Sequence, residues 1–238
     1  MWCWGENGNG QLADGTTNDH LTPNPVEPEW LDVEAGAEHA CRLRADDTLW
    51  CWGENQRGQL GVGNNVDQAS PARVSSLDSW TSVSLGFEHT CGITSDNALK
   101  CWGSNDDGQL GLGHTTERDA PQQVGVSTDW RAVAAGGDHT CALKTDRTLW
   151  CWGDNFHGEL GNGSTGGFAT APTQVGSDAD WDSVSAEFNY GCAVKVDGSL
   201  WCWGFNGFGM LGDGTQISRA VPTQVSAAPG WRSVDTGN

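Results

Sequence analysis

The sequence is poor in basic residues and in long apolar runs, and each shortage excludes a class of protein. It has 12 Lys and Arg against 31 Asp and Glu, which gives a formal net charge of −19. A phosphate backbone would be repelled by this charge, so we expect no nucleic-acid partner. No apolar run approaches the roughly 18 residues of a membrane-spanning helix, and we expect no membrane insertion. The acidity is explained by solubility or a salty habitat, or by attraction to a basic partner.

Tyrosine is also scarce, with one residue, whereas there are 34 Gly and 14 Trp. So many large aromatic residues are untypical of a disordered chain, and so many glycines are untypical of a helical one. The first residues, MWCWGENGNG, have neither the basic start nor the apolar core of a signal peptide. A signal removed upstream would also fit this start. At 238 residues the chain has room for one large β domain or two ordinary ones.

One phrase occurs five times along the chain. The copy CWGENQRGQLGVG begins at Cys51, and edited copies begin at Cys3, Cys101, Cys151 and Cys202, with gaps of 48, 50, 50 and 51 residues. Two further landmarks keep the same step, a W-x-x-V motif and a P-x-x-V motif. The W-x-x-V copies begin at Trp30, Trp80, Trp130, Trp181 and Trp231. A period near 50 predicts β units that are stacked or arranged around an axis.

Each unit contains the patterns of four short strands. Large and small residues alternate from Trp130 to Ala134, from His139 to Lys144 and from Thr148 to Trp152, with a turn at residues 145–147. A Gly-rich loop follows, and the P-x-x-V segment supplies an edge strand, where proline is tolerated. Four strands in each of several repeated units are typical of a β-propeller blade. In such a ring we expect large aromatic side chains to fill the core, namely the tryptophans that precede the glycine of the five phrases: Trp4, Trp52, Trp102, Trp152 and Trp203.

The motifs W-x-x-V, G-x-x-H-T, L-x-x-D-G-x-L, W-G-x-N-x-x-G-Q-L-G and P-x-x-V occur in this order along essentially the whole chain. In this the sequence resembles the regulator of chromosome condensation repeat family, as a cysteine-containing, bacterial-type variant. The resemblance implies an all-β propeller, usually of seven blades. It implies no single activity, because family members include a nucleotide-exchange factor, a plant ultraviolet photoreceptor and a secreted β-lactamase inhibitor.

We expect residues 1–238 to form one β-propeller of about five four-stranded blades, one of them incomplete. Five W-G phrases are present, but only four copies of the strand that begins with G-x-x-H-T or its equivalent. The chain is therefore either a piece of a longer array or an assembly unit that pairs through its terminal strands with another copy. The repeat units are approximately 1–30, 31–80, 81–130, 131–181 and 182–231, with 232–238 starting the next blade.

Eight of the nine cysteines form pairs ten residues apart, each pair on a hairpin with its turn midway. Opposed positions in antiparallel strands lie close to disulfide distance. Each bridge would close a loop of about eleven residues, worth somewhat under ~3 kcal/mol in the chain-entropy model. Reduced cysteines and zinc binding are weaker alternatives, since C-x-x-C clusters are absent. The predicted disulfides are Cys41–Cys51, Cys91–Cys101, Cys141–Cys151 and Cys192–Cys202.

The ninth cysteine, Cys3, lacks the strand that would carry its partner, so we expect it to be free or bonded to another chain. Disulfides persist in oxidising compartments. We therefore predict an extracellular, periplasmic or cell-surface location.

Nothing in the sequence indicates catalysis. His39, His89 and His139 occupy one repeated position, with Tyr190 in the fourth copy, so we expect them to hydrogen-bond between neighbouring blades. There is no G-x-S-x-G elbow, H-E-x-x-H pair or P-loop, and the Asp-rich segments do not have calcium-loop spacing. We predict no enzyme activity, no cofactor, no metal and no catalytic residues.

The resemblance to the family does point to a binding face. In the photoreceptor, sensing aromatic residues and their arginine neighbours lie between Gly and His of G-x-x-H-T; here those positions hold no Trp and no Arg. In the family fold these positions border the ring centre on one face, and we expect the N-x-x-G loops to border it too. The candidate binding residues are Glu38, Phe87, Glu88, Asp138, Phe156, His157, Phe188, Asn189, Phe205 and Phe208.

Carboxylates with aromatic side chains are suited to binding a basic protein or peptide, although ordinary solvated loops would have the same residues. We therefore predict a non-catalytic binding or scaffold module. The alternatives are an inhibitor that plugs an enzyme cleft, a structural protein that assembles end to end, and, less favoured, a hydrolase or peptidase.

Overall fold

The structure is a computed structural model and describes residues 2–26, 33–226 and 230–236. All elements within these ranges are β-strands, and no helix in them has the length and apolarity needed to cross a membrane. The strands form four four-stranded antiparallel sheets and one two-stranded sheet. The all-β propeller architecture predicted from the repeats is confirmed.

The four complete sheets, numbered first to fourth along the chain, each use four consecutive strands. The two-stranded sheet pairs β1 (Trp2–Gly5) with β2 (His20–Pro25). The first sheet consists of β3 (Glu34–Ala35), β4 (His39–Leu43), β5 (Leu49–Gly53) and β6 (Gln68–Arg73), and the second of β7 (Trp80–Leu85), β8 (His89–Thr94), β9 (Leu99–Gly103) and β10 (Arg118–Gln123). The third sheet consists of β11 (Trp130–Ala135), β12 (His139–Lys144), β13 (Leu149–Asp154) and β14 (Phe168–Gln174). The fourth sheet consists of β15 (Trp181–Glu187), β16 (Tyr190–Lys195), β17 (Leu200–Gly204) and β18 (Arg219–Ser226).

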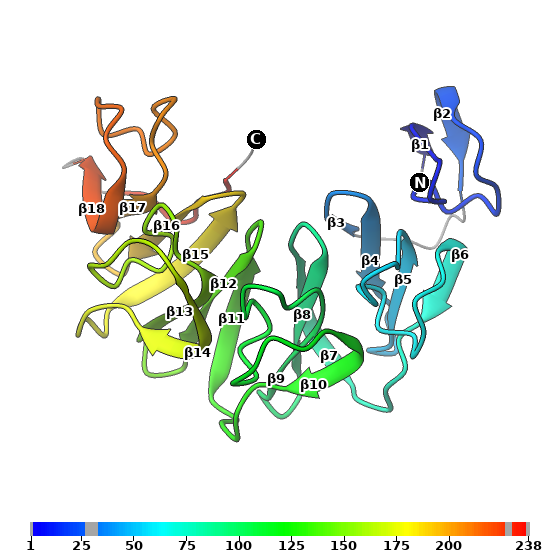
Figure 1. Cartoon of the computed structure of the whole chain (residues 1–238), viewed down its shortest axis with the longest axis horizontal. Helices are drawn as coiled ribbons and strands as arrows, with labels where there is room; N and C mark the ends of the chain where they lie inside the picture. The colour runs from blue at the N-terminus through cyan, green and yellow to red at the C-terminus, as the bar shows by residue number, and fades with distance from the viewer. Residues whose placement is uncertain (1, 27–32, 227–229, 237–238) are drawn as a thin grey trace.

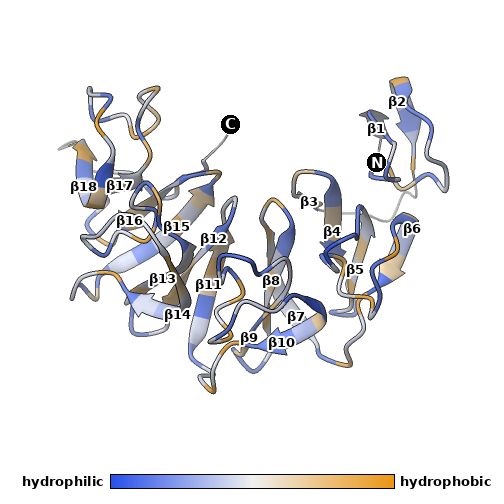
Figure 2. Cartoon of the chain, viewed as in Figure 1, coloured by the Kyte–Doolittle hydropathy of each residue, from blue (hydrophilic) through white to orange (hydrophobic). Residues whose placement is uncertain are grey.

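The sheets follow one another along an arc, with β1 and β2 at one end and the fourth sheet at the other (Figure 1). The first strands of the complete sheets, β3, β7, β11 and β15, are neighbours in that order. Hydrophobic segments are distributed over all four complete sheets rather than gathered in one block (Figure 2). We call the contact between the first and second sheets the first junction, and number the next two in the same way.

Each later sheet begins on the tryptophan that closes a predicted repeat unit, namely Trp80, Trp130 or Trp181. The corresponding Trp30 lies outside the described residues. Beyond β18, residues 230–236 form no strand, but Thr236 N donates to Ser185 Oγ at 3.1 Å. This contact repeats the one in which Ala135 N donates to Ser84 Oγ at 3.0 Å, so the segment packs on the fourth sheet as β11 packs on the second.

The hydrophobic core lies between the sheets. Trp102 and Trp152 are fully buried, and each indole N–H donates at 2.9 Å to a carbonyl of the preceding sheet, that of Gln59 or Gln109. Trp52 and Trp203 are buried in the same way. The core cluster around Cys91 and Trp152 therefore contains residues from both the second and third sheets.

Trp4, the fifth copy of this residue, does not share the predicted burial. It is 59% exposed, because within the described ranges no preceding sheet packs against β1. The expectation that all five periodic tryptophans fill the core is wrong at this position.

The four predicted disulfides are present. Each joins directly opposed residues of the second and third strands of a complete sheet, with Cα atoms 4.0–4.1 Å apart. Cys3 has no disulfide partner in the part of the chain that the structure describes. Whether it is free or bonded to another chain stays a prediction.

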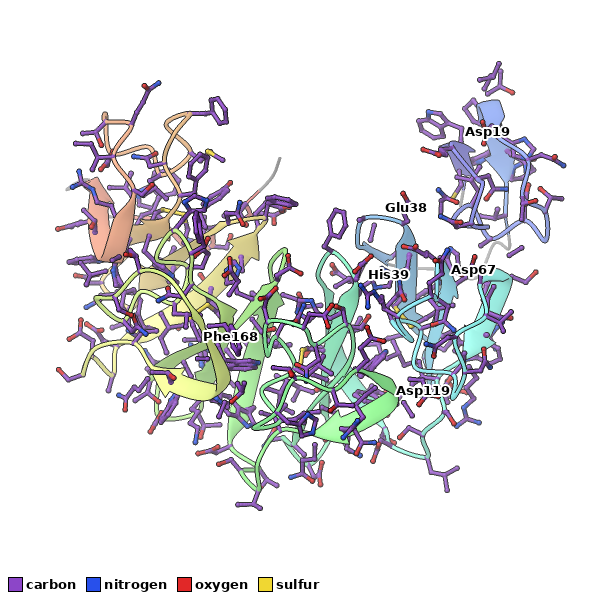
Figure 3. The ribbon with its side chains drawn as sticks, in the orientation of Figure 1. Asp19, Glu38, His39, Asp67, Asp119 and Phe168 are labelled. Carbon is purple, nitrogen blue, oxygen red and sulfur yellow. A yellow bond between two sulfur atoms is a disulfide. The ribbon has the colours of Figure 1, made fainter. Side chains whose placement is uncertain are left out.

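The repeated histidines join the sheets at two junctions. His39 Nε2 lies 3.0 Å from Thr90 Oγ1, and His89 Nε2 lies 2.9 Å from Thr140 Oγ1 (Figure 3 shows His39). Burial lowers the pKa of both imidazoles to about 3, so they are neutral. The prediction is wrong for His139, whose ring nitrogens have no hydrogen-bond partner in the described residues, because the fourth sheet has Gly191 in place of the threonine.

Candidate binding face

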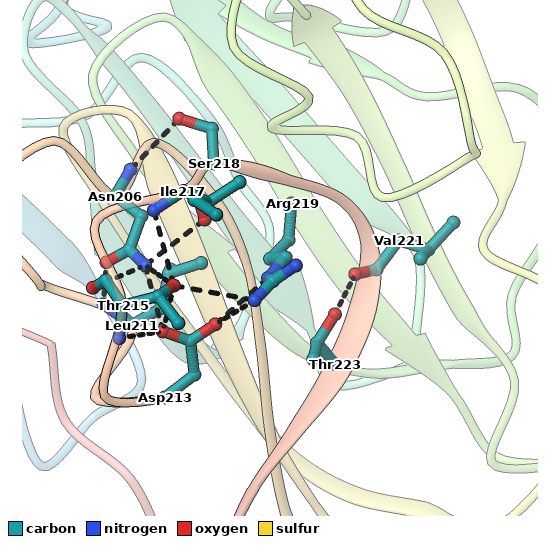
Figure 4. Close-up of polar contacts among 9 residues, drawn as sticks. All are labelled: Asn206, Leu211, Asp213, Thr215, Ile217, Ser218, Arg219, Val221 and Thr223. Atoms are coloured by element: carbon teal, nitrogen blue, oxygen red, sulfur yellow. Dashed lines mark hydrogen bonds and ion pairs between the residues drawn. The ribbon is translucent and has the colours of Figure 1, made fainter.

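The N-x-x-G loops are held by one buried asparagine in every copy. Its Oδ1 accepts the backbone N–H of the leucine five residues later, at 2.9–3.1 Å. Figure 4 shows the last copy, in which Asn206 binds Leu211 N and also donates to Asp213. Hydrogen bonds from Thr215 and Arg219 hold the pKa of the Asp213 carboxyl well below its usual range. This hydrogen bond is therefore the same in each copy, whatever the exposed residues of the loop are.

The G-x-x-H loops lie beside the N-x-x-G loops. In each complete sheet a backbone N–H at the start of the N-x-x-G loop donates to a carbonyl of the G-x-x-H loop at 2.8–2.9 Å. The four pairs are Glu54 with Glu38, Ser104 with Glu88, Asp154 with Asp138, and Phe205 with Asn189. The two sets of loops that the sequence singled out therefore form one face at the same ends of the strands.

Two of the candidate phenylalanines meet over the third sheet. The rings of Phe87 and Phe188 pack edge to face with centroids 5.9 Å apart, and each side chain is 46% exposed. Gly137 lies between them, donating from its N–H to Phe188 O and accepting from Phe87 N at its own carbonyl. A Cβ at Gly137 would lie 2.5 Å from Phe188 O, so only glycine permits this approach. Both rings border a cavity of about 700 Å³ lined by β7, β11 and β15.

The other candidate aromatic residues form a second group, on the third and fourth sheets. The His157 ring lies 4.9 Å from that of Phe156 and 4.7 Å from that of Phe205, which in turn packs against Phe208 at 6.0 Å. Phe156 is 69% exposed and Phe208 is 83% exposed. Exposed aromatic rings of this kind supply contact area for a partner.

The candidate carboxylates lie on the first three sheets. Glu38 accepts a hydrogen bond from Asn9, and Glu88 Oε2 lies 3.6 Å from Arg57 Nε. Asp138 accepts from Gln109 Nε2 at 3.2 Å. Burial, followed by the charges of Asp107 and Asp154, raises the pKa of Asp138 to about 6.

Four residues that sequence reasoning missed complete this face: Arg57, Asp107, Asp154 and Glu159. They lie in the N-x-x-G loops, whose sequences ENQRGQ, SNDDGQ and DNFHGE differ between copies in charge. Comparing these loops copy by copy would have identified Arg57 and Asp107 as opposite charges at one repeat position. It would also have shown that Glu159 replaces a repeated glutamine.

Glu159 is fully buried, and its environment is unlike that of the glutamines it replaces. Its Oε2 accepts the backbone N–H of His157 at 2.8 Å, as Gln109 Oε1 accepts from Asp107 N at 3.0 Å. Its Oε1 has no hydrogen-bond partner among the described residues. Burial is the main cause that raises the pKa of Glu159 to about 7, and the charge of Asp154 adds to it.

The face offers charge, hydrogen-bonding groups and aromatic surface. No group of three or more His, Cys, Asp or Glu residues is placed to hold a metal ion within the described ranges. The arrangement is suited to noncovalent recognition of a partner that presents cationic and apolar groups.

Comparison with protein families identifies the repeats. The pattern described as the regulator of chromosome condensation (RCC1) repeat matches residues 1–43, 46–93, 98–143 and 197–238. A second RCC1 repeat pattern matches residues 30–59, 80–109 and 130–159. No curated protein matches the chain by sequence.

Solved propellers resemble the whole arc. Human WBSCR16 superposes with a TM-score of 0.84 at 19% identity, covering 94% of this chain and 62% of that one. Yeast RCC1 (Prp20) bound to Kap60 gives 0.79 at 22% identity, covering 90% and 53%. Prp20p from Saccharomyces cerevisiae, described with its binding to Gsp1p and histones, gives 0.78 at 23% identity, covering 90% and 55%. The chain thus spans between about half and three fifths of these structures, and the likeness concerns the fold.

Proposed function

The chain belongs to the regulator of chromosome condensation (RCC1) repeat family, and from that premise we propose that it is a non-catalytic protein-binding module. It binds its partner through the face formed by the G-x-x-H and N-x-x-G loops. The partner is a protein or peptide that presents basic and apolar side chains. A relative in the fold, yeast Prp20p, is described as binding proteins, which supports binding as the general role.

The observation that carries the proposal is the composition of the loop face. Phe87 and Phe188 pack together with nearly half of each side chain exposed, and the G-x-x-H loops also carry Glu38, Glu88 and Asp138. Rigid aromatic rings bind with little loss of conformational entropy, and a complementary charge steers the partner. The net charge of −19 strengthens that steering toward a basic partner.

We place this function outside the cytoplasm. Four disulfides, each linking two strands of one sheet, support this location because such bonds persist in oxidising compartments. Mass spectrometry of the natural protein should find all four pairs linked, and free thiols at these eight positions would contradict the location.

The test of the binding role is a capture experiment with two variants of equal size. The immobilised chain and a triple variant, Phe87→Ser, Glu88→Gln and Phe188→Ser, are exposed to the proteins secreted by the source cells. A control variant carries changes at the exposed hairpin tips, which lie at the opposite ends of the strands, for example Asp47→Asn and Arg147→Gln. We expect partners bound by the chain and the control but not by the triple variant. Equal capture by all three would contradict the proposal.

A further inference from the structure

The first and second junctions are joined by the same polar contacts near the loop face. At each junction a threonine of the later sheet, Thr90 or Thr140, donates from its hydroxyl to a glutamine carbonyl of the earlier sheet. The same hydroxyl lies within hydrogen-bond distance of a histidine of the earlier sheet. The glutamine side chain donates from Nε2 to the start of its own loop, at 3.3 Å for Gln59 and 3.5 Å for Gln109. These contacts stabilise both junctions.

The third junction differs at two of these positions. Glu159 stands in place of the glutamine, and Gly191 stands in place of the threonine. The carbonyl of Glu159 still accepts from Trp203 Nε1 at 2.7 Å, but Gly191 has no hydroxyl to offer as a second donor. Among the described residues, Glu159 Oε1 and both ring nitrogens of His139 are buried without a hydrogen-bond partner. Buried polar groups of this kind are costly, so we expect this junction to open at the loop face more readily than the other two.

The opposite end of the third junction has a contact of its own. Arg131, near the start of β11, donates from Nη2 to the carbonyls of Trp181 and Asp182 at 2.8 and 2.7 Å. These two residues begin β15, at the end of the strand away from the loops. The equivalent residue of the second sheet, Thr81, donates within its own sheet, to Ile93 O. The fourth sheet is therefore held at the strand starts, about which it can rotate while the loop ends separate.

Both groups of candidate aromatic residues extend across the third junction. Phe188 of the fourth sheet packs on Phe87, and its carbonyl accepts from Gly137 N of the third sheet at 3.1 Å. The Phe205 ring of the fourth sheet lies 4.7 Å from the His157 ring of the third. Separation of the loop ends would therefore divide both groups.

Glu159 makes this junction sensitive to pH. Burial raises the pKa of its carboxyl to about 7, and the negative charge of Asp154 on the same loop adds to the rise. His157 contributes only its backbone N–H, which donates to Glu159 Oε2 at 2.8 Å. His139 is neutral, because burial lowers the pKa of its imidazole to about 4.

The fourth sheet does not offset the charge of an ionised Glu159. Asn189 stands where the third sheet has Asp138, so this loop position is neutral. The carbonyl of Arg219 lies beside the Glu159 loop, but its guanidinium is paired with Asp213 at 2.7 Å. Glu187 lines the cavity of about 700 Å³.

We propose that the third junction is a pH-sensitive joint, which opens at the loop face when Glu159 loses its proton and so divides the partner-binding face. The fourth sheet rotates about the contacts of Arg131. This inference rests on the proposed function and supplies its regulation: the partner is held at mildly acidic pH and released at alkaline pH.

Linkage gives the direction and size of the effect. The pKa of Glu159 in the closed junction is raised from 4.5 to about 7, so the closed junction is most favoured below 4.5 and loses stability as pH rises toward 7 and above. Between pH 6 and pH 8 this lowers the ratio of closed to open junctions about tenfold. His139 acts in the opposite direction, since opening restores its pKa from about 4 to 6.5, and it raises the ratio about fourfold over the same range.

Hydrogen exchange of the indole N–H groups reports on each junction separately, because Trp102, Trp152 and Trp203 each donate across one junction. Nuclear magnetic resonance of the whole chain measures their protection relative to an unstructured indole at the same pH. At pH 8 we expect Trp203 to be the least protected of the three. The Gly137 amide, which donates to Phe188 across the same junction, should follow it. Equal protection of the three indoles would overturn the joint.

Glu159→Gln removes the ionisable group and restores the repeated residue. The protection of Trp203 in this variant should exceed that in the parent chain, and the ratio of the two should rise about tenfold from pH 6 to pH 8. The contribution of His139 is common to both chains and cancels in this ratio. A ratio that does not change with pH would overturn the role of Glu159.

Gln109→Glu is the matched control, because it places the same buried carboxyl one junction away. It should lower the protection of Trp152 at pH 8 and leave that of Trp203 within about twofold. Equal losses at the two indoles would indicate unfolding of the whole chain and would overturn a local joint. The capture experiment compares variants at a single pH and does not depend on the joint, so the two proposals can fail separately.

Discussion

The first and second junctions of the arc share one framework but differ in the charge on their loops. At both, a tryptophan and a threonine of the later sheet donate to one carbonyl of the earlier sheet, that of Gln59 at the first and Gln109 at the second. Above this framework Arg57 lies among carboxylates at the first junction, and Asp107 faces carboxylates at the second. The stabilising contacts are therefore separate from the loop residues that are available for recognition.

The largest expected effect lies in the shared framework. Trp102→Ala removes a fully buried ring and leaves the Gln59 carbonyl with one donor fewer, so we expect the free energy of unfolding to fall by about 3–5 kcal/mol. Phe156→Ala, a change in the exposed loop ring, should alter it by less than about 0.5 kcal/mol. Urea unfolding of both variants measures the difference. Similar losses in the two would mean that framework and loops are not separate.

The second-largest expected loss of stability is that of a disulfide, because each complete sheet has one linking its second and third strands. Replacing Cys91 and Cys101 together by alanine should lower the free energy of unfolding by about 2–3 kcal/mol, since the unfolded chain is no longer constrained. The same replacement at Cys141 and Cys151 is the matched comparison and should cost a similar amount. An unchanged midpoint in denaturant for both would refute the stabilising role.

Glu159→Gln sharpens the comparison of the loops by restoring the repeated glutamine. The folded pKa of Glu159 is raised from 4.5 to about 7, so the unfolded chain holds fewer protons between these values and the stability from this group is lost as pH rises. The free energy of unfolding of the variant should therefore exceed that of the parent chain by about 1–3 kcal/mol at pH 8. At pH 5 the two should differ little.

The reciprocal variant Gln109→Glu is the control for that prediction. It places the same buried carboxyl beside Asp138 and should destabilise the chain at pH 8 and less at pH 5. Equal pH profiles for the parent chain and both variants would refute the account of Glu159.

Asp107→Arg should change stability less than the framework and Glu159 variants do. A half-exposed ion pair contributes little, so the free energy of unfolding should rise by about 0.5–1 kcal/mol at low salt, and by less at high salt. Asp47→Arg should change it by a few tenths. A clear loss of stability in Asp107→Arg would show that a guanidinium does not fit the second junction.

The repeat period and the strand patterns predicted most of the framework, because each copy repeats the same burial pattern. The ten-residue cysteine spacing predicted the disulfides, because a hairpin whose turn lies midway between the two cysteines places them directly opposite one another. Alternation along His139–Lys144 predicted a strand but not its burial on both faces, which arises because neighbouring sheets cover it. The predicted burial of Trp4 was wrong because its ring is covered only where a preceding sheet packs against it, and within the described residues no sheet precedes β1.

The candidate face was predicted in part. The resemblance to the family indicated the loops, and the structure places their backbones side by side. What the sequence could not show is how charges pair across junctions, because Arg57 and its partner Glu117 are 60 residues apart. The lack of a partner for His139 likewise depends on the next sheet, which has Gly191 in place of the threonine.

The most direct test of the account is the titration of the Asp138 carboxyl by carbon-detected nuclear magnetic resonance. We predict a pKa of about 6 in the parent chain, because the carboxyl is buried beside Asp107 and Asp154 without a cation. In Asp107→Arg the pKa should fall, while in Asp47→Arg it should stay the same. A pKa near the ordinary value of 3.8 in the parent chain, unchanged in Asp107→Arg, would contradict the account.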